Sequence, residues 1–154
     1  MKIIFFTYSL LVSLFSILFA FYYQFFENYP PCELCIYQRI PYFGIICVSL
    51  FFFLFKEYFK VLSFLIVFLF IFSVMISAFH AGVELGFWNF KSACTNNATN
   101  FEDIDQLRAF LDEVPITKCD EVIWSYKGIS MASYNFIFSV VNLIIITILR
   151  IKAK

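Results

Sequence analysis

Residues 61–79 read VLSFLIVFLFIFSVMISAF and contain no charged side chain. A transmembrane helix needs about 20 predominantly apolar residues to cross roughly 30 Å of hydrocarbon. The stretch meets both requirements and therefore predicts a membrane-spanning helix.

Three further uncharged stretches repeat this pattern on either side, at residues 3–26, 40–55 and 129–149. The second is the shortest, and Pro41 is tolerated there if it lies in the first helical turn. A cleaved signal peptide is the alternative for the first stretch, but its apolar run exceeds the 7–15 residues typical of a signal sequence. The sequence thus predicts an all-α membrane protein, a four-helix transmembrane bundle forming a single domain over residues 1–154.

The composition excludes a soluble globular domain. Of the 154 residues, 62% are hydrophobic and only 14% are charged, against about 25% charged residues in a typical soluble domain. The formal net charge is zero, which argues against nucleic acid as a partner because phosphate binding requires an excess of basic residues.

The zero net charge is the sum of two opposite faces. The chain ends and the turn at residues 56–60 contain six Lys or Arg and one Glu, a net charge of +5. The two other loops, residues 27–39 and 80–128, contain five Lys or Arg and ten Asp or Glu, a net charge of −5. By the positive-inside rule, both termini are expected in the cytoplasm and both long loops on the outer side.

The longer outer loop also has an amphipathic pattern. Its apolar residues recur at helical spacing between acidic and basic ones, and Pro115 would end such a helix; they are Phe101, Ile104, Leu107, Phe110, Leu111 and Val114. We expect a short amphipathic helix that lies either on the bilayer surface or against the loop itself.

Four of the five cysteines fall in the two outer loops, Cys32 and Cys35 in the first and Cys94 and Cys119 in the second. The exported side of a bacterial membrane is oxidising, so two pairs in this location predict disulfide chemistry. Cys47 falls inside the second apolar stretch, where we expect a buried free Cys that behaves as a small hydrophobe.

Cys32-Glu33-Leu34-Cys35 is a C-x-x-C motif, in which one thiol often has a lowered pKa. Cys35 is expected near the start of the second helix, where the helix dipole stabilises a thiolate. A C-x-x-C is also half of a zinc site, but no second C-x-x-C exists and His80 is the only His. The spacing therefore favours redox chemistry over metal binding.

A disulfide between Cys94 and Cys119 has two interpretations. It would constrain the unfolded chain by roughly 3.5 kcal/mol, which suffices for a purely structural role. Alternatively, two dithiol pairs on one face would pass electrons by thiol–disulfide exchange to an acceptor soluble in lipid, for which a quinone is the obvious candidate.

Four polar residues beside the first pair are candidates for binding such an acceptor: Gln38, Arg39, His80 and Glu84. Arg39 is placed to hydrogen-bond a quinone oxygen or to stabilise a thiolate, or alternatively to reach the lipid headgroups. His80 and Glu84 lie one helical turn apart and would assist proton transfer, although a satisfied interfacial His is the plainer interpretation. Gln38 would bind either a headgroup or a cofactor.

The motif at residues 32–39, Cys-Glu-Leu-Cys-Ile-Tyr-Gln-Arg, resembles the C-x-L-C-x-x-Q-R signature of the DsbB disulfide-formation family. Residues 79–84 after the third span and residues 119–131 before the fourth are also similar to that family. The resemblance covers essentially the whole chain, with four spans and two Cys-bearing loops in the expected order.

The resemblance implies a thiol:quinone oxidoreductase of the bacterial inner membrane that reoxidises a DsbA-like periplasmic dithiol oxidase. Cys94 would form the mixed disulfide with that partner and Cys119 would complete its pair. Cys32 would then exchange with Cys119, and Cys35 as a thiolate would contact ubiquinone or menaquinone, aided by Arg39. We expect a monomer whose other partner is the lipid with its quinone pool.

Two rival functions are weighed against this interpretation. A reductase similar to the vitamin K epoxide reductase group also combines four helices, a C-x-x-C and a quinone, but that group is expected to carry its C-x-x-C at the start of a later span. A non-catalytic metal-binding or adaptor protein would use Cys32, Cys35 and His80 and would show stoichiometric zinc without turnover.

Overall fold

The computed structural model describes residues 1–90 and 118–153. Four long helices run side by side, α1 (Lys2–Phe25), α2 (Glu33–Leu54), α3 (Phe59–Glu84) and α6 (Met131–Ala153). All four are long and apolar enough to cross a membrane, which confirms the predicted helical bundle. The expected amphipathic helix at residues 101–114 and Cys94 lie outside the described residues.

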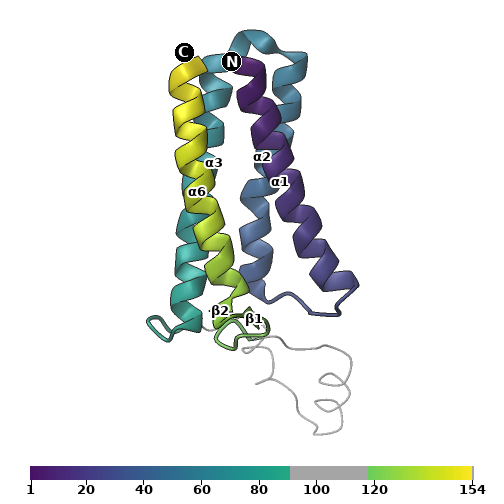
Figure 1. Ribbon diagram of the computed structural model, residues 1–154, viewed down its shortest axis with the longest axis vertical. Coiled ribbons are helices and arrows are strands. Elements are labelled where there is room, and N and C mark those ends of the chain that lie inside the picture. The colour runs from purple at the N-terminus through teal and green to yellow at the C-terminus, as the bar shows by residue number, and fades with distance from the viewer. Residues whose placement is uncertain (91–117, 154) are drawn as a thin grey trace, which may run out of the picture.

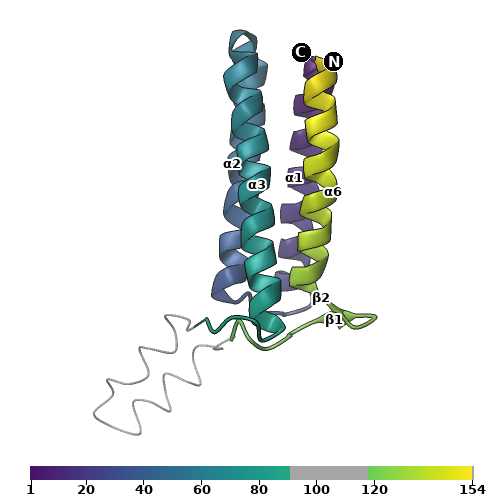
Figure 2. The same ribbon diagram turned by 90° about the vertical axis from the view of Figure 1, so that its left-hand side faces the viewer.

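The chain folds as an up-and-down bundle with both termini at one end (Figure 1). A single 3-10 turn, η1 (Lys56–Tyr58), joins α2 to α3 at that end. The short segment between α1 and α2 lies at the opposite end, as do the described residues after α3 (85–90) and before α6 (118–130), seen again in Figure 2. We call this opposite end the thiol end, because Cys32, Cys35 and Cys119 lie there.

The predicted boundaries are wrong in one place that matters, the start of the second helix. Residues 33–39 were expected in a loop, but α2 already begins at Glu33. Cys32 is its N-cap, and the Cys32 sulfur accepts a hydrogen bond from the backbone N–H of Cys35, which satisfies a donor that the first turn would leave unpaired. Pro41 therefore lies inside the helix, as membrane helices allow.

The last helix begins two residues later than expected because residues 129–130 form a strand. A two-residue strand β1 (Ser125–Tyr126) pairs antiparallel with β2 (Ile129–Ser130). The turn residues Lys127 and Gly128 both have positive φ, 52° and 79°, as two-residue hairpin turns require. This hairpin leads directly into α6.

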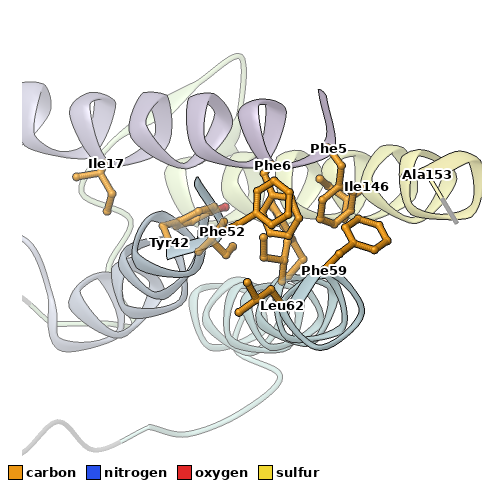
Figure 3. Packing of buried hydrophobic residues seen from close by; sticks show 12 residues of the cluster. Phe5, Phe6, Ile17, Tyr42, Phe52, Phe59, Leu62, Ile146 and Ala153 are labelled. Atoms are coloured by element: carbon orange, nitrogen blue, oxygen red, sulfur yellow. The ribbon is translucent and has the colours of Figure 1, made fainter. Parts of the chain in front are cut away.

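The apolar core lies toward the end that holds the termini and is built largely from Phe (Figure 3). Phe6 of α1 stacks on Phe52 of α2 with ring centroids 3.7 Å apart. Phe59 of α3 meets both rings edge to face. These rings pack the helices together at the end that holds the termini, whereas the thiol end also contains polar and sulfur-bearing side chains.

Small polar residues occupy the interfaces between the helices. Ser9, Ser49, Ser73 and Ser139 are each completely buried, as expected where membrane helices pack closely on small side chains. Cys47 lies in α2, as its place in the sequence indicated, but the expectation that it is buried is wrong. Its side chain is exposed on the outer face of the helix, where it would contact lipid.

Candidate functional site

The C-x-x-C motif forms the N-terminus of α2. Pro30 and Pro31 precede it, and Cys32 is still extended, with φ −73° and ψ 170°, so the helix starts only after this residue. The two sulfurs of Cys32 and Cys35 are 2.8 Å apart, and the backbone N–H of Cys35 lies 3.3 Å from the Cys32 sulfur. The expectation that Cys35 lies near the start of the second helix is confirmed, and the structure places it in the first turn.

The two thiols of the motif are not equivalent. The hydrogen bond that the Cys32 thiol donates to Cys35, together with burial, raises the pKa of Cys32 to about 12, although His80 opposes this rise. Cys32 is therefore a protonated donor at neutral pH. Cys35 accepts that hydrogen bond and lies in the first helical turn, where the helix dipole favours negative charge.

Cys119 lies against Cys32, although 86 residues separate them in the sequence. Both side chains are buried in a small cluster with Leu34 and Val83. Burial raises the pKa of Cys119 to about 11, and the backbone amides of Leu34 and Glu33 at the start of α2 oppose this rise. The same helix N-terminus thus faces the sulfurs of both thiol loops.

His80, on the last turns of α3, completes the group around Cys32. Its Nε2 lies 3.5 Å from the Cys32 sulfur and 3.9 Å from Glu84 Oε1, and the residue is only 2% exposed. Glu84 also accepts a hydrogen bond from the hydroxyl of Ser130, the last residue of β2 and the one directly before α6. Helices α2, α3 and α6 therefore meet at this point.

A chain of polar side chains runs from His80 into the bundle. Gln38 Nε2 lies 2.9 Å from His80 Nδ1, and Asn135 Nδ2 donates to Gln38 Oε1 over 2.9 Å. The Tyr42 hydroxyl is 2.9 Å from both Asn135 Oδ1 and Ser139 Oγ, and Ser139 continues to Ser73 over 3.1 Å. Polar residues inside membrane spans are generally functional, and by that criterion Asn135 and Tyr42 were missed in the sequence.

Arg39 lies on a different side of α2 from this chain. Its Nη1 donates to Gln24 Oε1 over 2.5 Å, and its guanidinium lies over the ring of Phe21, 5.2 Å from the centroid. Both partners belong to α1. Arg39 is half-buried and is held at the thiol end between α1 and α2.

These groups line one cavity of about 530 Å³ between α1, α2, α6 and the hairpin segment. Cys32, Cys35, Gln38 and Arg39 contribute to its wall from α2 and the residue before it, and His80 and Glu84 contribute from α3. The remaining wall is largely aromatic and includes Phe15, Phe19, Tyr23, Trp124, Tyr134 and Phe138. The structure thus brings seven of the eight candidate residues together, since Cys119 packs on Cys32 beside this wall.

Four apolar spans and a buried thiol cluster at one end of the bundle define a multi-pass membrane protein of the dithiol oxidoreductase class. Comparison with known proteins narrows the class. The chain belongs to the DsbB family, because the family model for "Disulfide bond formation protein DsbB" matches residues 3–149. It is therefore an oxidoreductase of disulfide bond formation.

A relative of this chain is "Uncharacterized protein RP370" of Rickettsia prowazekii (strain Madrid E). The two sequences are 26% identical over 145 residues, which cover 93% of this chain and 84% of the relative. The similarity therefore extends over the whole bundle.

Proposed function

We propose that the protein oxidises a DsbA-like periplasmic dithiol protein and delivers the electrons to a membrane quinone. The observation that carries this proposal is the order in which the three described thiols contact one another. Cys119 packs on Cys32, Cys32 lies 2.8 Å from Cys35, and Cys35 lines the apolar cavity. Cys119, the described thiol of the second loop, is thereby connected through Cys32 and Cys35 to a cavity among the membrane-spanning helices.

The exchange steps follow from this order. A thiolate of the partner attacks Cys94 of the Cys94–Cys119 disulfide, and Cys119 leaves as a thiolate. Cys119 then attacks Cys32 of the Cys32–Cys35 disulfide, which releases Cys35 as a thiolate and forms a Cys32–Cys119 disulfide. The backbone amides at the start of α2 face Cys119 and would stabilise the leaving thiolate of the first step.

Two further exchanges complete the cycle. The second thiolate of the partner attacks the mixed disulfide, so the partner leaves oxidised and Cys94 is released. Cys94 attacks Cys119 of the Cys32–Cys119 disulfide, which restores the Cys94–Cys119 disulfide and leaves Cys32 and Cys35 reduced. The pair of electrons and the two protons of the partner's thiols now reside on Cys32 and Cys35.

The hydrogen-bonding side chains and the aromatic residues that line the cavity fit a quinone. The aromatic side chains of the cavity suit an apolar ring, and Arg39, Gln38 and His80 contribute polar groups to its wall. When bound, the quinone accepts two electrons and two protons, which regenerates the Cys32–Cys35 disulfide. Arg39 would hold a carbonyl oxygen, and His80, beside the protonated Cys32 thiol, would hold and transfer its proton.

The orientation belongs to the same proposal. The basic ends of the chain and residues 56–60, which have a net charge of +1, lie together at the end opposite the thiols (Figure 1). Under the positive-inside rule this end faces the cytoplasm of a bacterial inner membrane, and the thiol end faces the periplasm.

A turnover assay tests the proposal. The purified protein is mixed with a reduced DsbA-like protein and either ubiquinone or menaquinone, and the loss of quinone absorbance is followed. We expect catalytic loss of absorbance with the native chain and none with Cys35→Ser. Cys47→Ser is the matched control on the same helix and should turn over normally, because its side chain lies on the outer face.

A failure of turnover with every quinone and partner, in protein that retains its helical circular dichroism, contradicts the proposal. Turnover by Cys35→Ser equal to that of the native chain would contradict the assigned order of the thiols.

A further inference from the structure

Three side chains with metal-binding atoms meet at the thiol end. The sulfurs of Cys32 and Cys35 and a ring nitrogen of His80 all lie within 4.8 Å of one another. Cys32 and His80 are each 2% exposed. The sequence alone disfavoured a metal because it contains no second C-x-x-C and only one His, but the packing of α3 against α2 places that His beside the C-x-x-C motif.

The distances suit a tetrahedral zinc ion. With Zn–S near 2.3 Å and Zn–N near 2.0 Å, the S···N edge of such a site is about 3.5 Å and the S···S edge about 3.8 Å. Cys32 Sγ and His80 Nε2 are already 3.5 Å apart. The two sulfurs, at 2.8 Å, need to separate by about 1 Å, which a modest rotation of the Cys35 side chain provides.

A fourth ligand is available from the same cluster. Cys119 packs against Cys32 and is 3% exposed. Its sulfur lies outside the group of ligand atoms within 4.8 Å of one another, so it would have to move toward the ion to complete a Cys₃His set. Structural zinc sites commonly use this set. Glu84, whose Oε1 lies 3.9 Å from His80 Nε2, offers a carboxylate near the same ring nitrogen.

The network of hydrogen-bonded polar side chains behind His80 accommodates both neutral tautomers of its imidazole ring. With Gln38 Nε2 donating to Nδ1, the ring carries its proton on Nε2 and donates toward Cys32. If the side-chain amides of Gln38 and Asn135 both flip by 180°, His80 Nδ1–H donates to Gln38 Oε1. Every hydrogen bond of this polar network is then kept. The Tyr42 hydroxyl then donates to Ser139, and His80 Nε2 is free to bind a metal.

We propose that the reduced protein binds one Zn²⁺ through Cys32, Cys35 and His80, with Cys119 as the fourth ligand. Binding releases the protons of the coordinating thiols and changes no oxidation state. Oxidation prevents zinc binding, because a Cys32–Cys35 disulfide has no thiolate to offer the metal. Bound zinc in turn occupies the sulfurs that exchange needs, so it is a reversible inhibitor of the proposed oxidase.

This inference rests on the proposed function only for its inhibitory consequence, and metal binding is measured without quinone or partner. The full chain is purified in detergent, reduced, desalted without oxygen and titrated with Co²⁺, which gives a thiolate charge-transfer band in the near ultraviolet. We expect one Co²⁺ per chain, displaced by Zn²⁺, and loss of the band after oxidation with diamide.

Variants identify the ligands. Cys32→Ser should abolish the band, and Gln38→Leu should weaken binding by about 10-fold to 100-fold because it removes the support of the His80 ring. Cys47→Ser and Cys94→Ser leave the ligand set intact and should bind Co²⁺ like the native chain. Circular dichroism of Cys32→Ser verifies that its helices persist.

Three results would overturn the inference: no charge-transfer band in the reduced chain, equal binding by the oxidised chain, or loss of the band in Cys47→Ser or Cys94→Ser. Turnover in the presence of a chelator separates the two proposals. Normal turnover without Co²⁺ binding refutes the metal site alone, whereas stoichiometric binding without turnover refutes the oxidase alone.

Discussion

Cys32 contacts every other described group that takes part in the proposed exchange. Its sulfur is 2.8 Å from that of Cys35 and 3.5 Å from His80 Nε2, and it packs on Cys119. A sulfur in this position is able to form a disulfide with either neighbouring Cys without a movement of the helices. Cys32 is thus the branch point between the two thiol pairs.

The contact between Cys32 and Cys119 predicts a specific crosslink. In a chain with Cys35→Ser and Cys94→Ser, mild oxidation should produce a Cys32–Cys119 disulfide, because each loses its usual partner and the two remain packed together. Peptide mapping by mass spectrometry without reduction identifies the crosslink. The matched chain with Cys32→Ser and Cys94→Ser should form the alternative Cys35–Cys119 bond more slowly, and equal rates would disprove the preferred pairing.

The raised pKa of Cys119 predicts an unusual pH profile. A pKa of about 11 leaves less thiolate at any pH below it than an ordinary thiol would have, so alkylation is slow at pH 7. The rate should rise about tenfold per pH unit and continue to rise beyond pH 9. Mass spectrometry of the reduced chain after treatment with iodoacetamide measures the alkylation rate of Cys119. Denatured chain is the control, in which the rate should level off near the ordinary thiol pKa, and the same levelling in the folded chain would contradict the burial argument.

At the scale of elements, the end of α3 positions His80 and Glu84. The N–H of Phe87 donates to Gly82 O over 2.8 Å and that of Gly86 to Val83 O over 3.1 Å, and Gly86 has φ +76°. This is the Schellman arrangement, in which a left-handed Gly closes a helix. It turns the chain back so that Trp88 packs over Gly82 and stacks on Phe79.

Gly82→Ala tests this helix end. A Cβ there would lie 1.9 Å from the Trp88 ring, so the ring must leave its place, and we expect a loss of about 1–3 kcal/mol in stability. Thermal denaturation followed by circular dichroism measures the loss, and a change in Trp emission reports the displaced ring. Gly44→Ala is the matched control, because its nearest neighbour is the flexible Leu69 side chain at 3.2 Å. Equal melting temperatures for the two variants would contradict the packing of Trp88.

Some of these elements could be predicted from the sequence and others could not. The four spans follow from hydropathy alone, since 30 Å of hydrocarbon imposes the length of the helix. The start of α2 was placed too late because Gln38 and Arg39 look like loop residues, whereas the Cys32 cap and the bundle's polar interior accommodate them. The hairpin before α6 was missed although Lys127-Gly128 is a turn signal.

The candidate site shows the same limit. Cys32, Cys35 and their helix position could be predicted from local spacing. The contacts of Cys32 with His80 and Cys119 could not, because they depend on how α3 packs against α2 and on how the segment before α6 returns to the thiol end. Asn135 gave a local signal, an amide within an apolar stretch, but its partner Gln38 lies 97 residues away.

At the scale of the whole molecule, function depends on which side of the membrane the thiol end faces. In the sequence, the chain ends and residues 56–60 carry the excess of basic residues, and the two other loops, 27–39 and 80–128, carry the excess of acidic ones. Electrons taken from a periplasmic protein enter the membrane only if the thiol end faces the periplasm. The charge asymmetry and the proposed chemistry therefore require the same orientation.

Two single cysteines at opposite ends test this orientation. In a chain whose native Cys are replaced by Ser, Glu57→Cys places a thiol on η1 and Tyr126→Cys places one on the hairpin, and both native side chains are exposed. A membrane-impermeant maleimide applied to intact spheroplasts should label the Tyr126→Cys chain and leave the Glu57→Cys chain unlabelled until the membrane is permeabilised. The reverse pattern would invert the bundle and place the thiols in the reducing cytoplasm, where the proposed oxidation of a periplasmic partner is impossible.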